Sequence, residues 1–177
     1  MANVVLVIDM TRGFFEKGYP LYCGDRARRI IPNVQRLLEQ ELARGSKILF
    51  LNDHHDPDDL EFKMFPPHCI AGTPETEVIP ELAEYPGEII PKKRFSAFYG
   101  TSLEERLLQL KPDKIIITGV CTDICVCDTV CGARDRDYEV EVPTDCVASF
   151  DEEAHRFALG HMEKVLGAKL TSVGGDQ

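Results

Sequence analysis

The sequence predicts an α/β protein built on a parallel sheet. Short apolar segments rich in β-branched residues alternate along the chain with longer segments in which apolar residues recur at helical spacing. Such alternation is typical of parallel sheets, whose strands are buried on both faces and joined by helices. The length of 177 residues is enough for a core of its own, and we expect residues 1–177 to form one domain.

The first half of the chain begins with a continuous apolar strand at 3–9. Residues 26–44 follow as a helix, because their leucines, isoleucine and valine fall at helical spacing before a glycine. Residues 47–53 form a second buried strand. The stretch 54–87 is irregular and rich in proline and histidine, and a loop this long in a compact domain is expected to build a site.

The pattern continues with a short third strand at 87–92 and a helix at 101–110 that carries four leucines. Residues 113–119 form a fourth strand, which is again continuous and apolar. A helix from about 123 to 135 follows this strand directly. The cysteine-rich stretch "GVCTDICVC" lies across that junction.

The last part of the chain predicts a fifth strand at 138–145, more exposed than the others because its polar and apolar residues alternate. Residues 150–166 predict a helix, with Ser149 or Asp151 as its N-cap. Residues 168–173 are a candidate for a short final strand.

Composition excludes several classes of function. The net charge of −10 and the lack of a large Lys/Arg patch argue against nucleic acid and anionic membranes as partners. The apolar runs are too short to span a bilayer, and no signal segment opens the chain. We therefore expect a cytoplasmic protein whose seven cysteines are free thiols rather than a disulfide framework.

Polar residues lie where several of these strands end. In a parallel sheet the carboxyl ends of the strands share one edge, where ligands bind. Asp9, Asp53, Lys92 and the turn 119–125 should therefore lie together.

Each of these residues has an ordinary explanation when taken alone. Asp9 could be an N-cap, Lys92 a solvated lysine and Cys125 a small buried residue. Together they offer a nucleophile, a base and a charge stabiliser. A cysteine in the first turn of a helix, next to an ammonium group, favours the thiolate, and a nearby carboxylate can take the thiol proton.

The other cysteines separate from Cys125 by helical phase. Cys127 and Cys131 fall on the apolar stripe of the helix and are expected in the core. Cys121, in the turn, is expected to contribute its backbone N–H rather than its sulfur. The spacing differs from the paired Cys-x2-Cys of structural zinc sites, and no functional signal attaches to the remaining three, Cys23, Cys69 and Cys146.

The stretch "NDHHDPDDLEFKMFPPH" at 52–68 offers a second cluster. A polar surface loop is the ordinary explanation of such a stretch. Its mixed nitrogen and oxygen ligands suit Zn, Mn or Fe, with Zn the first choice, and His54 competes with His55 as a ligand. The candidate ligands are Asp53, His55, Glu61 and His68. The neighbouring Asp56, Asp58 and Asp59 are expected to cap and solvate the loop.

At these residues the sequence resembles the isochorismatase-like cysteine hydrolases, and among them the nicotinamidases. The matching segments run in family order along nearly the whole chain: "VLVIDMTRGFF", "NDHHDPDDLEF", "FPPHCIAGT", "KKRFSAFYGTSL", "GVCTDICV" and "PTDCVAS". The resemblance implies a three-layer Rossmann-like fold with a six-stranded parallel sheet flanked by helices, usually in a homodimer or larger homo-oligomer.

The resemblance also assigns roles to residues. It implies the catalytic triad Asp9, Lys92 and Cys125, with Lys92 preferred to Lys93 because the family lysine stands two residues before the arginine of "RFSAF". It implies a cis peptide bond between Val120 and Cys121, and an oxyanion hole formed by the backbone N–H groups of Cys121 and Cys125.

The implied substrate pocket has an aromatic wall and a metal. Phe14, Phe65 and Phe95 fall where the family walls its pocket, although core packing explains such residues as well. The metal of nicotinamidases would be held by Asp53, His55, Glu61 and His68 and would bind the pyridine nitrogen of the substrate. Phe65 stands where many nicotinamidases have Trp, and the chain contains no Trp.

The function so implied is hydrolysis of nicotinamide to nicotinic acid and ammonia through a cysteine thioester, a step of NAD salvage. The alternatives are another small amide, an N-carbamoyl compound (as in N-carbamoylsarcosine amidase), a ureidoacrylate-like substrate or an isochorismate-type vinyl ether. The last does not need a thiol nucleophile. From a different class, the chain could be a non-catalytic binding or thiol-sensing protein on the same fold.

Overall fold

A seven-stranded parallel sheet lies at the centre of the structure, a computed structural model that describes residues 2–175. Its strands are β1 (Val4–Ile8), β2 (Lys47–Asp53), β3 (Glu88–Lys92), β4 (Ile115–Val120), β5 (Val140–Pro143), β6 (Val147–Ala148) and β7 (Lys169–Thr171). Their order is β3-β2-β1-β4-β5-β7, with β6 paired to β4. Every pairing is parallel, which confirms the predicted fold class. The six expected strands are present, and β6 is an addition.

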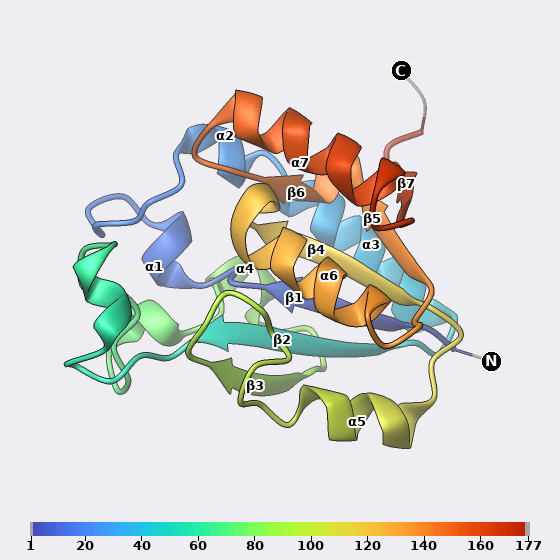
Figure 1. Cartoon of the computed structure of the whole chain (residues 1–177), viewed down its shortest axis with the longest axis horizontal. Helices are drawn as coiled ribbons and strands as arrows, with labels where there is room; N and C mark the ends of the chain where they lie inside the picture. Colours follow the sequence, from blue (N-terminus) through green and yellow to red (C-terminus); the bar gives the residue numbers. More distant parts are fainter. Residues whose placement is uncertain (1, 176–177) are drawn as a thin grey trace.

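Helices cover both faces of this sheet. They are α1 (Arg12–Phe15), α2 (Asp25–Arg28), α3 (Ile31–Ala43), α4 (Pro80–Ala83), α5 (Leu103–Leu110), α6 (Cys127–Arg134) and α7 (Glu152–Lys164). In Figure 1, α6 crosses in front of the sheet and α3 lies behind it. Among residues 2–175, no helix is long and apolar enough to cross a membrane.

Alternate residues of β1 build the two halves of the core. Val5 and Val7 pack with the apolar face of α3, whereas Leu6 and Ile8 pack with α5, α6 and α7. A strand buried on both faces needs apolar residues at every position, which is why residues 4–8 read as one continuous apolar run. Full burial of each such side chain contributes about 1.5–3 kcal/mol to folding.

Two of the predicted helices differ in detail from the observed ones. The segment 26–44 divides into α2 and α3, and a proline stands in the first turn of α3, where a missing N–H costs nothing. The segment 123–135 begins as a π-helical turn, η3 (Thr122–Val126), before α6. The N-cap of α7 is Asp151, whose carboxylate accepts a hydrogen bond from the Ala154 N–H.

The irregular stretch after β2 folds back over the carboxyl edge of the sheet. It contains two 3-10 turns, η1 (Leu60–Lys63) and η2 (Pro74–Thr76), and ends in α4. Isolated bridges tie His55 to Ile70 and Thr11 to Val78. Figure 1 shows this stretch beside α1, at the end of the sheet toward which β2 points.

The strand order reverses beside β1. The chain passes from β1 to β2 and β3 on one side and then returns to place β4 on the other. Gly119, at the end of β4, has a φ of 113°, and a Cβ built there would lie 2.0 Å from the carbonyl oxygen of Ile8. The close approach of β1 and β4 at the reversal point therefore requires glycine, and this point is where α/β sheets bind ligands.

Candidate active site and metal centre

Three strand ends deliver the predicted nucleophile, base and lysine to one buried point. Asp9 follows β1, Lys92 closes β3 and Cys125 lies in the π-helical turn after β4. All three are buried, and Lys92 Nζ lies 3.0 Å from Asp9 Oδ2 and 3.4 Å from Cys125 Sγ. The topology thus brings the predicted triad together.

The ammonium group of Lys92 uses all three of its N–H donors. They go to Asp53 Oδ1 at 2.6 Å, to the backbone oxygen of Arg94 at 3.0 Å and to Cys125 Sγ at 3.4 Å. Burial alone would lower the pKa of Lys92, but Asp53 and Asp9 raise it well above its ordinary value. The group is therefore a fixed positive charge beside the thiol.

Asp9 is held in an unusual backbone conformation. Its φ of 52° lies in the left-handed region, which costs free energy for a residue other than glycine. Its N–H donates to the Leu51 carbonyl oxygen at 2.8 Å, and its Oδ1 accepts the Asp53 N–H at 2.8 Å. Asp9 Oδ2 makes an ion pair with Lys92 but has no hydrogen bond from the described residues, so it remains free to take a proton.

The surroundings of Asp9 and Cys125 shift the pKa values of both groups. Burial, and after it the charge of Asp53, raises the pKa of Asp9 to about 6, although Lys92 lowers it. Burial also raises the pKa of the Cys125 thiol well above its ordinary value, and the attraction of Lys92 only partly offsets this. Lys92 thus favours the thiolate, as expected, but burial has the larger effect. Burial therefore favours the protonated thiol, with the Asp9 carboxylate as the neighbouring base.

The turn before Cys125 has the backbone geometry that the family resemblance implies. The peptide bond between Val120 and Cys121 is cis. The Cys121 carbonyl oxygen accepts hydrogen bonds from the N–H groups of Ile124 and Val126, which fixes the turn. Cys121 Sγ lies 3.8 Å from Cys23 Sγ, on the side of the core that contains α3.

The remaining cysteines are free thiols, as predicted. Cys127 is half-buried and packs against the core, which agrees in part with its expected place there. Cys131 is predicted in the core as well, but it is half-buried in the middle of α6 and its thiol faces Asp135. The predicted phase assumes an α-helix from residue 123, and the wider π-helical turn shifts the outer cysteines toward the surface.

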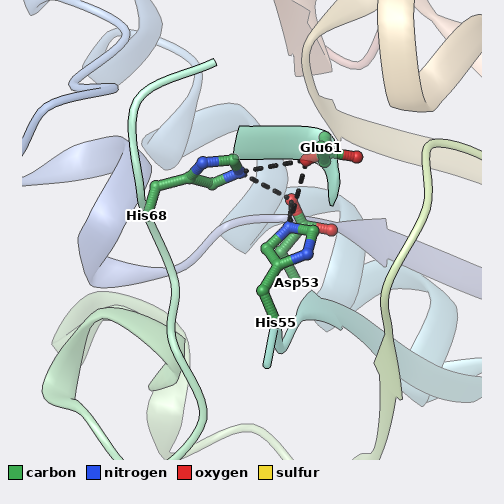
Figure 2. A group of neighbouring side chains, drawn as sticks. All are labelled: Asp53, His55, Glu61 and His68. Carbon is green, nitrogen blue, oxygen red and sulfur yellow. Dashed lines mark ion pairs between the residues drawn. The ribbon is translucent and has the colours of Figure 1, made fainter. Parts of the chain in front are cut away.

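The four predicted metal ligands meet in one group. Asp53, His55, Glu61 and His68 are buried, and each offers a ligand atom within 4.8 Å of the others. Figure 2 shows the two imidazole rings converging on the two carboxylates. His55 Nε2 lies 3.2 Å from Glu61 Oε2 and 3.4 Å from Asp53 Oδ2, and His68 Nε2 lies 3.4 Å from Glu61 Oε2.

The structure also decides between the two adjacent histidines. His55 belongs to the group of four, whereas His54 is half-buried and stands outside it. The chain stays extended beyond β2, so the side chains of Asp53 and His55 point to the same side and that of His54 points away.

These residues fit a divalent cation. His55 Nε2 is buried and has no hydrogen bond from any described residue, so it is an unused donor atom aimed at two carboxylates. Burial would lower the pKa of His55, but Asp53 and Glu61 raise it to about 10, and the pKa of His68 is raised for similar reasons. The group therefore attracts positive charge, and two nitrogens with two carboxylate oxygens suit zinc.

Asp59 is predicted to cap and solvate the loop, and this prediction is only partly right. Its carboxylate does cap η1 by accepting the Glu61 N–H. Its side chain is only 4% exposed, however, and it also lies 3.0 Å from His55 Nδ1. Sequence reasoning missed this contact, because a residue four positions after His55 in an irregular loop gives no periodic signal.

An apolar pocket opens between the triad and the group of four. Phe14, Phe65 and Phe95 line it, as predicted, and the sequence missed three further apolar residues of the lining, Leu21, Ile124 and Phe150. The rings of Phe65 and Phe95 meet edge to face at 6.0 Å, and Phe14 lies 5.7 Å from the ring of His68. The aromatic wall is thus continuous with a metal-ligand candidate.

Known proteins share this arrangement of sequence and fold. The isochorismatase domain model matches residues 3–173. A pyrazinamidase/nicotinamidase structure from Streptococcus mutans UA159 is 34% identical with a TM-score of 0.90, and the match covers 96% of this chain and 99% of that one. The isochorismatase family protein PncA of Bacillus subtilis (strain 168), itself described as uncharacterized, is 32% identical over 96% of this chain and 99% of its own length.

A third relative carries a metal. The pyrazinamidase of Pyrococcus horikoshii, solved in complex with zinc, is 28% identical with a TM-score of 0.88, and the match covers 97% of this chain and 99% of that one. The domain match extends over nearly the whole sequence, and it includes every strand end described above. The chain belongs to the isochorismatase family of hydrolases.

Proposed function

We propose that this amidase-type hydrolase is a nicotinamidase, which cleaves nicotinamide to nicotinic acid and ammonia. One observation carries the proposal: a buried thiol and carboxylate, both in contact with a buried ammonium group, line an aromatic-walled pocket together with three of the four convergent metal-ligand side chains. The relatives named for nicotinamide and pyrazinamide hydrolysis, both small aromatic amides, support it. A flat heteroaromatic carboxamide suits a pocket walled by Phe14, Phe65 and Phe95.

Proton transfer comes first in this reaction. As Cys125 Sγ attacks the carboxamide carbon, its proton passes to Asp9 Oδ2, which has no hydrogen bond from the described residues. A base with a pKa of about 6 is ionised at neutral pH and is strong enough to share the proton of an attacking thiol. Lys92, 3.4 Å from the sulfur, stabilises the negative charge that develops there.

The tetrahedral intermediate needs donors for its oxyanion. We assign these to the backbone N–H groups of Cys121 and Cys125, at the turn where β4 ends. When the intermediate collapses, the carbon–nitrogen bond breaks and the proton on Asp9 leaves with ammonia. Water then attacks the thioester carbon and gives a proton to Asp9, and the carbon–sulfur bond breaks. The acid is released and Cys125 regains its proton.

Asp53, His55, Glu61 and His68 would hold one divalent transition metal, with zinc the first choice. When bound, it supplies a Lewis acid that accepts a lone pair from the ring nitrogen of the substrate. Asp53 also orients the ammonium of Lys92, since its Oδ1 accepts a hydrogen bond from that group.

An ammonia-release assay over a small panel of amides tests the proposal. Nicotinamide and pyrazinamide should be hydrolysed, whereas benzamide, which lacks the ring nitrogen, should be a poor substrate. Cys125→Ala should reduce turnover by a factor on the order of 10³ or more, because it removes the nucleophile. Cys131→Ala is the matched control and should keep full activity, since that thiol lies outside the pocket.

The panel also separates the alternatives. Ammonia from N-carbamoylsarcosine but not from nicotinamide would move the assignment to an N-carbamoyl substrate. Release of ammonia by Cys125→Ala at the wild-type rate would overturn the thioester mechanism. A wild-type protein inert toward every member would leave the non-catalytic alternative on the same fold.

We also propose a homo-oligomeric, cytoplasmic protein, as the family resemblance suggests. Light scattering on the purified chain would report the oligomeric state, and a monomer at micromolar concentration would contradict it.

A further inference from the structure

One carboxylate at the back of the metal-ligand group has no role in the reaction described above. Asp59 Oδ2 lies 3.0 Å from His55 Nδ1, the ring nitrogen that points away from the other ligands. Its Oδ1 accepts the backbone N–H of Glu61 at 2.9 Å. Asp59 therefore contacts two of the four ligand residues without facing the ligand cluster itself.

The contact determines where the imidazole carries its proton. An ionised carboxylate has no hydrogen to donate, so the hydrogen bond requires the proton on His55 Nδ1. When the ring is neutral, as a metal ligand must be, the lone pair is then on Nε2, and this atom is buried, directed at Asp53 and Glu61, and without a hydrogen bond from the described residues. A lone pair in this position is what a metal ligand needs.

Arg94 fixes the carboxylate in turn. Its Nη1 lies 2.9 Å from Asp59 Oδ1 and 3.0 Å from Asp59 Oδ2, so one guanidinium nitrogen holds both oxygens. The backbone oxygen of Arg94 also accepts a hydrogen bond from Lys92 Nζ. The segment that follows β3 thus anchors the catalytic ammonium and the carboxylate behind His55 together.

We propose that Asp59, held by Arg94, is a positioning residue of a divalent-metal site. Asp59 selects the tautomer and ring orientation of His55 and holds the backbone of Glu61 in place. The inference rests on the metal centre of the proposed function. It goes further, because it assigns the ligand geometry to a residue outside the group of four.

The neighbouring aspartates show that the placement is specific. Asp56 and Asp58 are exposed, and Asp56 pairs only with the exposed Lys93 among the described residues. Asp59 has its side chain 4% exposed and engaged at both oxygens. A loop that needed aspartate only for solubility would not bury this one against a histidine and an arginine.

Asp59→Asn is the decisive variant. If the amide oxygen stays on the Glu61 N–H, the amide nitrogen faces His55 Nδ1 and donates to it. The ring proton then moves to Nε2, where it blocks a metal. If the amide flips, its N–H groups face the Glu61 N–H, so that two donors oppose each other. In either orientation the amide nitrogen also turns a donor toward the Arg94 guanidinium, which is itself a donor.

The readout is zinc affinity of the metal-free protein, measured in competition with a chromophoric chelator. Asp59→Asn should bind zinc about 10–100-fold more weakly than wild type. Asp58→Asn, the matched control, should bind as wild type does. Arg94→Gln should show a smaller loss in the same direction, and it serves as the second variant if Asp59→Asn does not fold.

A spectroscopic readout separates positioning from general loosening of the loop. In zinc-loaded wild type with 15N-labelled histidine, His55 should show a proton on Nδ1. His68 is the internal reference, because its Nδ1 faces the Pro66 carbonyl oxygen rather than Asp59. Asp59→Asn should change the tautomer signal of His55 and leave that of His68 unchanged.

Two negative results have different meanings. If wild type binds no zinc, the metal centre of the proposed function fails and the inference fails with it. If wild type, Asp59→Asn and Asp58→Asn bind zinc equally, the metal centre stands and the role of Asp59 is overturned. Equal changes at His55 and His68 would also overturn it.

Discussion

The surroundings of Asp9 predict how the activity should depend on pH. It is 1% exposed, and burial together with Asp53 raises its pKa to about 6. A carboxylate at an ordinary pKa would be too weak a base to share the proton of a buried thiol. Burial therefore makes Asp9 a stronger base than an ordinary carboxylate.

The expected consequence is an acid limit on activity. In the proposed mechanism Asp9 accepts the thiol proton only when it is ionised, so kcat/KM for nicotinamide should fall as the pH drops through about 6. At pH values below this pKa, each further drop of one pH unit should reduce kcat/KM about tenfold. A pH–rate profile recorded with zinc-loaded protein tests this. A profile flat down to a pH of about 4.5 would show that Asp9 is not the base.

The meeting of the three candidate residues could be predicted from the sequence, but their protonation could not. Asp9, Lys92 and Cys125 stand at strand ends, and strand ends are visible as the points where apolar runs stop. The thiol state depends on how completely distant segments exclude water from the sulfur. Leu21 and Phe150 line the same pocket from segments without a periodic pattern, so the desolvation that raises the pKa of Cys125 could not be derived beforehand.

The junction of β1 and β4 sets the geometry of the site at the level of elements. Gly119 adopts a φ of 113°, and its Cα faces the Ile8 carbonyl so closely that no side chain fits. Three residues later the chain begins the π-helical turn that carries Cys125.

Gly119→Ala should therefore destabilise the protein strongly. A Cβ 2.0 Å from a backbone oxygen requires the two strands to separate, and the positive φ adds a further cost. Together these should reduce the free energy of unfolding by at least about 3 kcal/mol. Urea unfolding of wild type and variant measures the difference. Equal stabilities would show that β1 and β4 are not in close contact.

Gly160→Ala is the matched control for this substitution. Gly160 lies inside α7, and a methyl group added to its Cα would have nothing within 4 Å. Alanine should therefore stabilise the helix by up to about 1 kcal/mol. The same urea experiment should show the opposite sign for the two glycine variants.

The elements that the sequence predicted well are those with strong periodicity. Strands β1, β2 and β4 are continuous apolar runs, and α3 and α7 are long helices. The missed elements are short: β6 has two residues, and α1 and α4 have four each. Their form depends on the contacts they make rather than on their own sequence, because a single turn has too few residues for a pattern.

At the scale of the whole molecule, the site depends on segments far apart in the sequence. The sheet order places the ends of β1, β2, β3 and β4 at one edge, and the loop after β2 supplies three of the four ligand candidates. Spacing alone left His54 and His55 as equal candidates. The two-residue period of an extended chain continuing from Asp53 is the signal that separates them.

Asp53 contacts both the candidate catalytic residues and the candidate metal ligands. Its Oδ1 accepts from Lys92 Nζ at 2.6 Å, while its Oδ2 lies 3.4 Å from His55 Nε2. One carboxylate thus belongs to both centres, and occupancy of one is thermodynamically linked to ionisation in the other, with equal effect in both directions. Asp53 contributes to the raised pKa of the Cys125 thiol, after burial and alongside Asp9.

A cation bound to Asp53 would cancel part of the negative charge of its carboxylate. One equivalent of zinc should therefore lower the thiol pKa and speed iodoacetamide alkylation of Cys125 at fixed pH, while Cys131 serves as an unaffected reference in the same mass spectrum. Equal or slower labelling with zinc would show that the two centres are independent. By reciprocity, conditions that ionise the thiol should tighten zinc binding. The reactivity of Cys125 would then depend on whether the metal site is occupied.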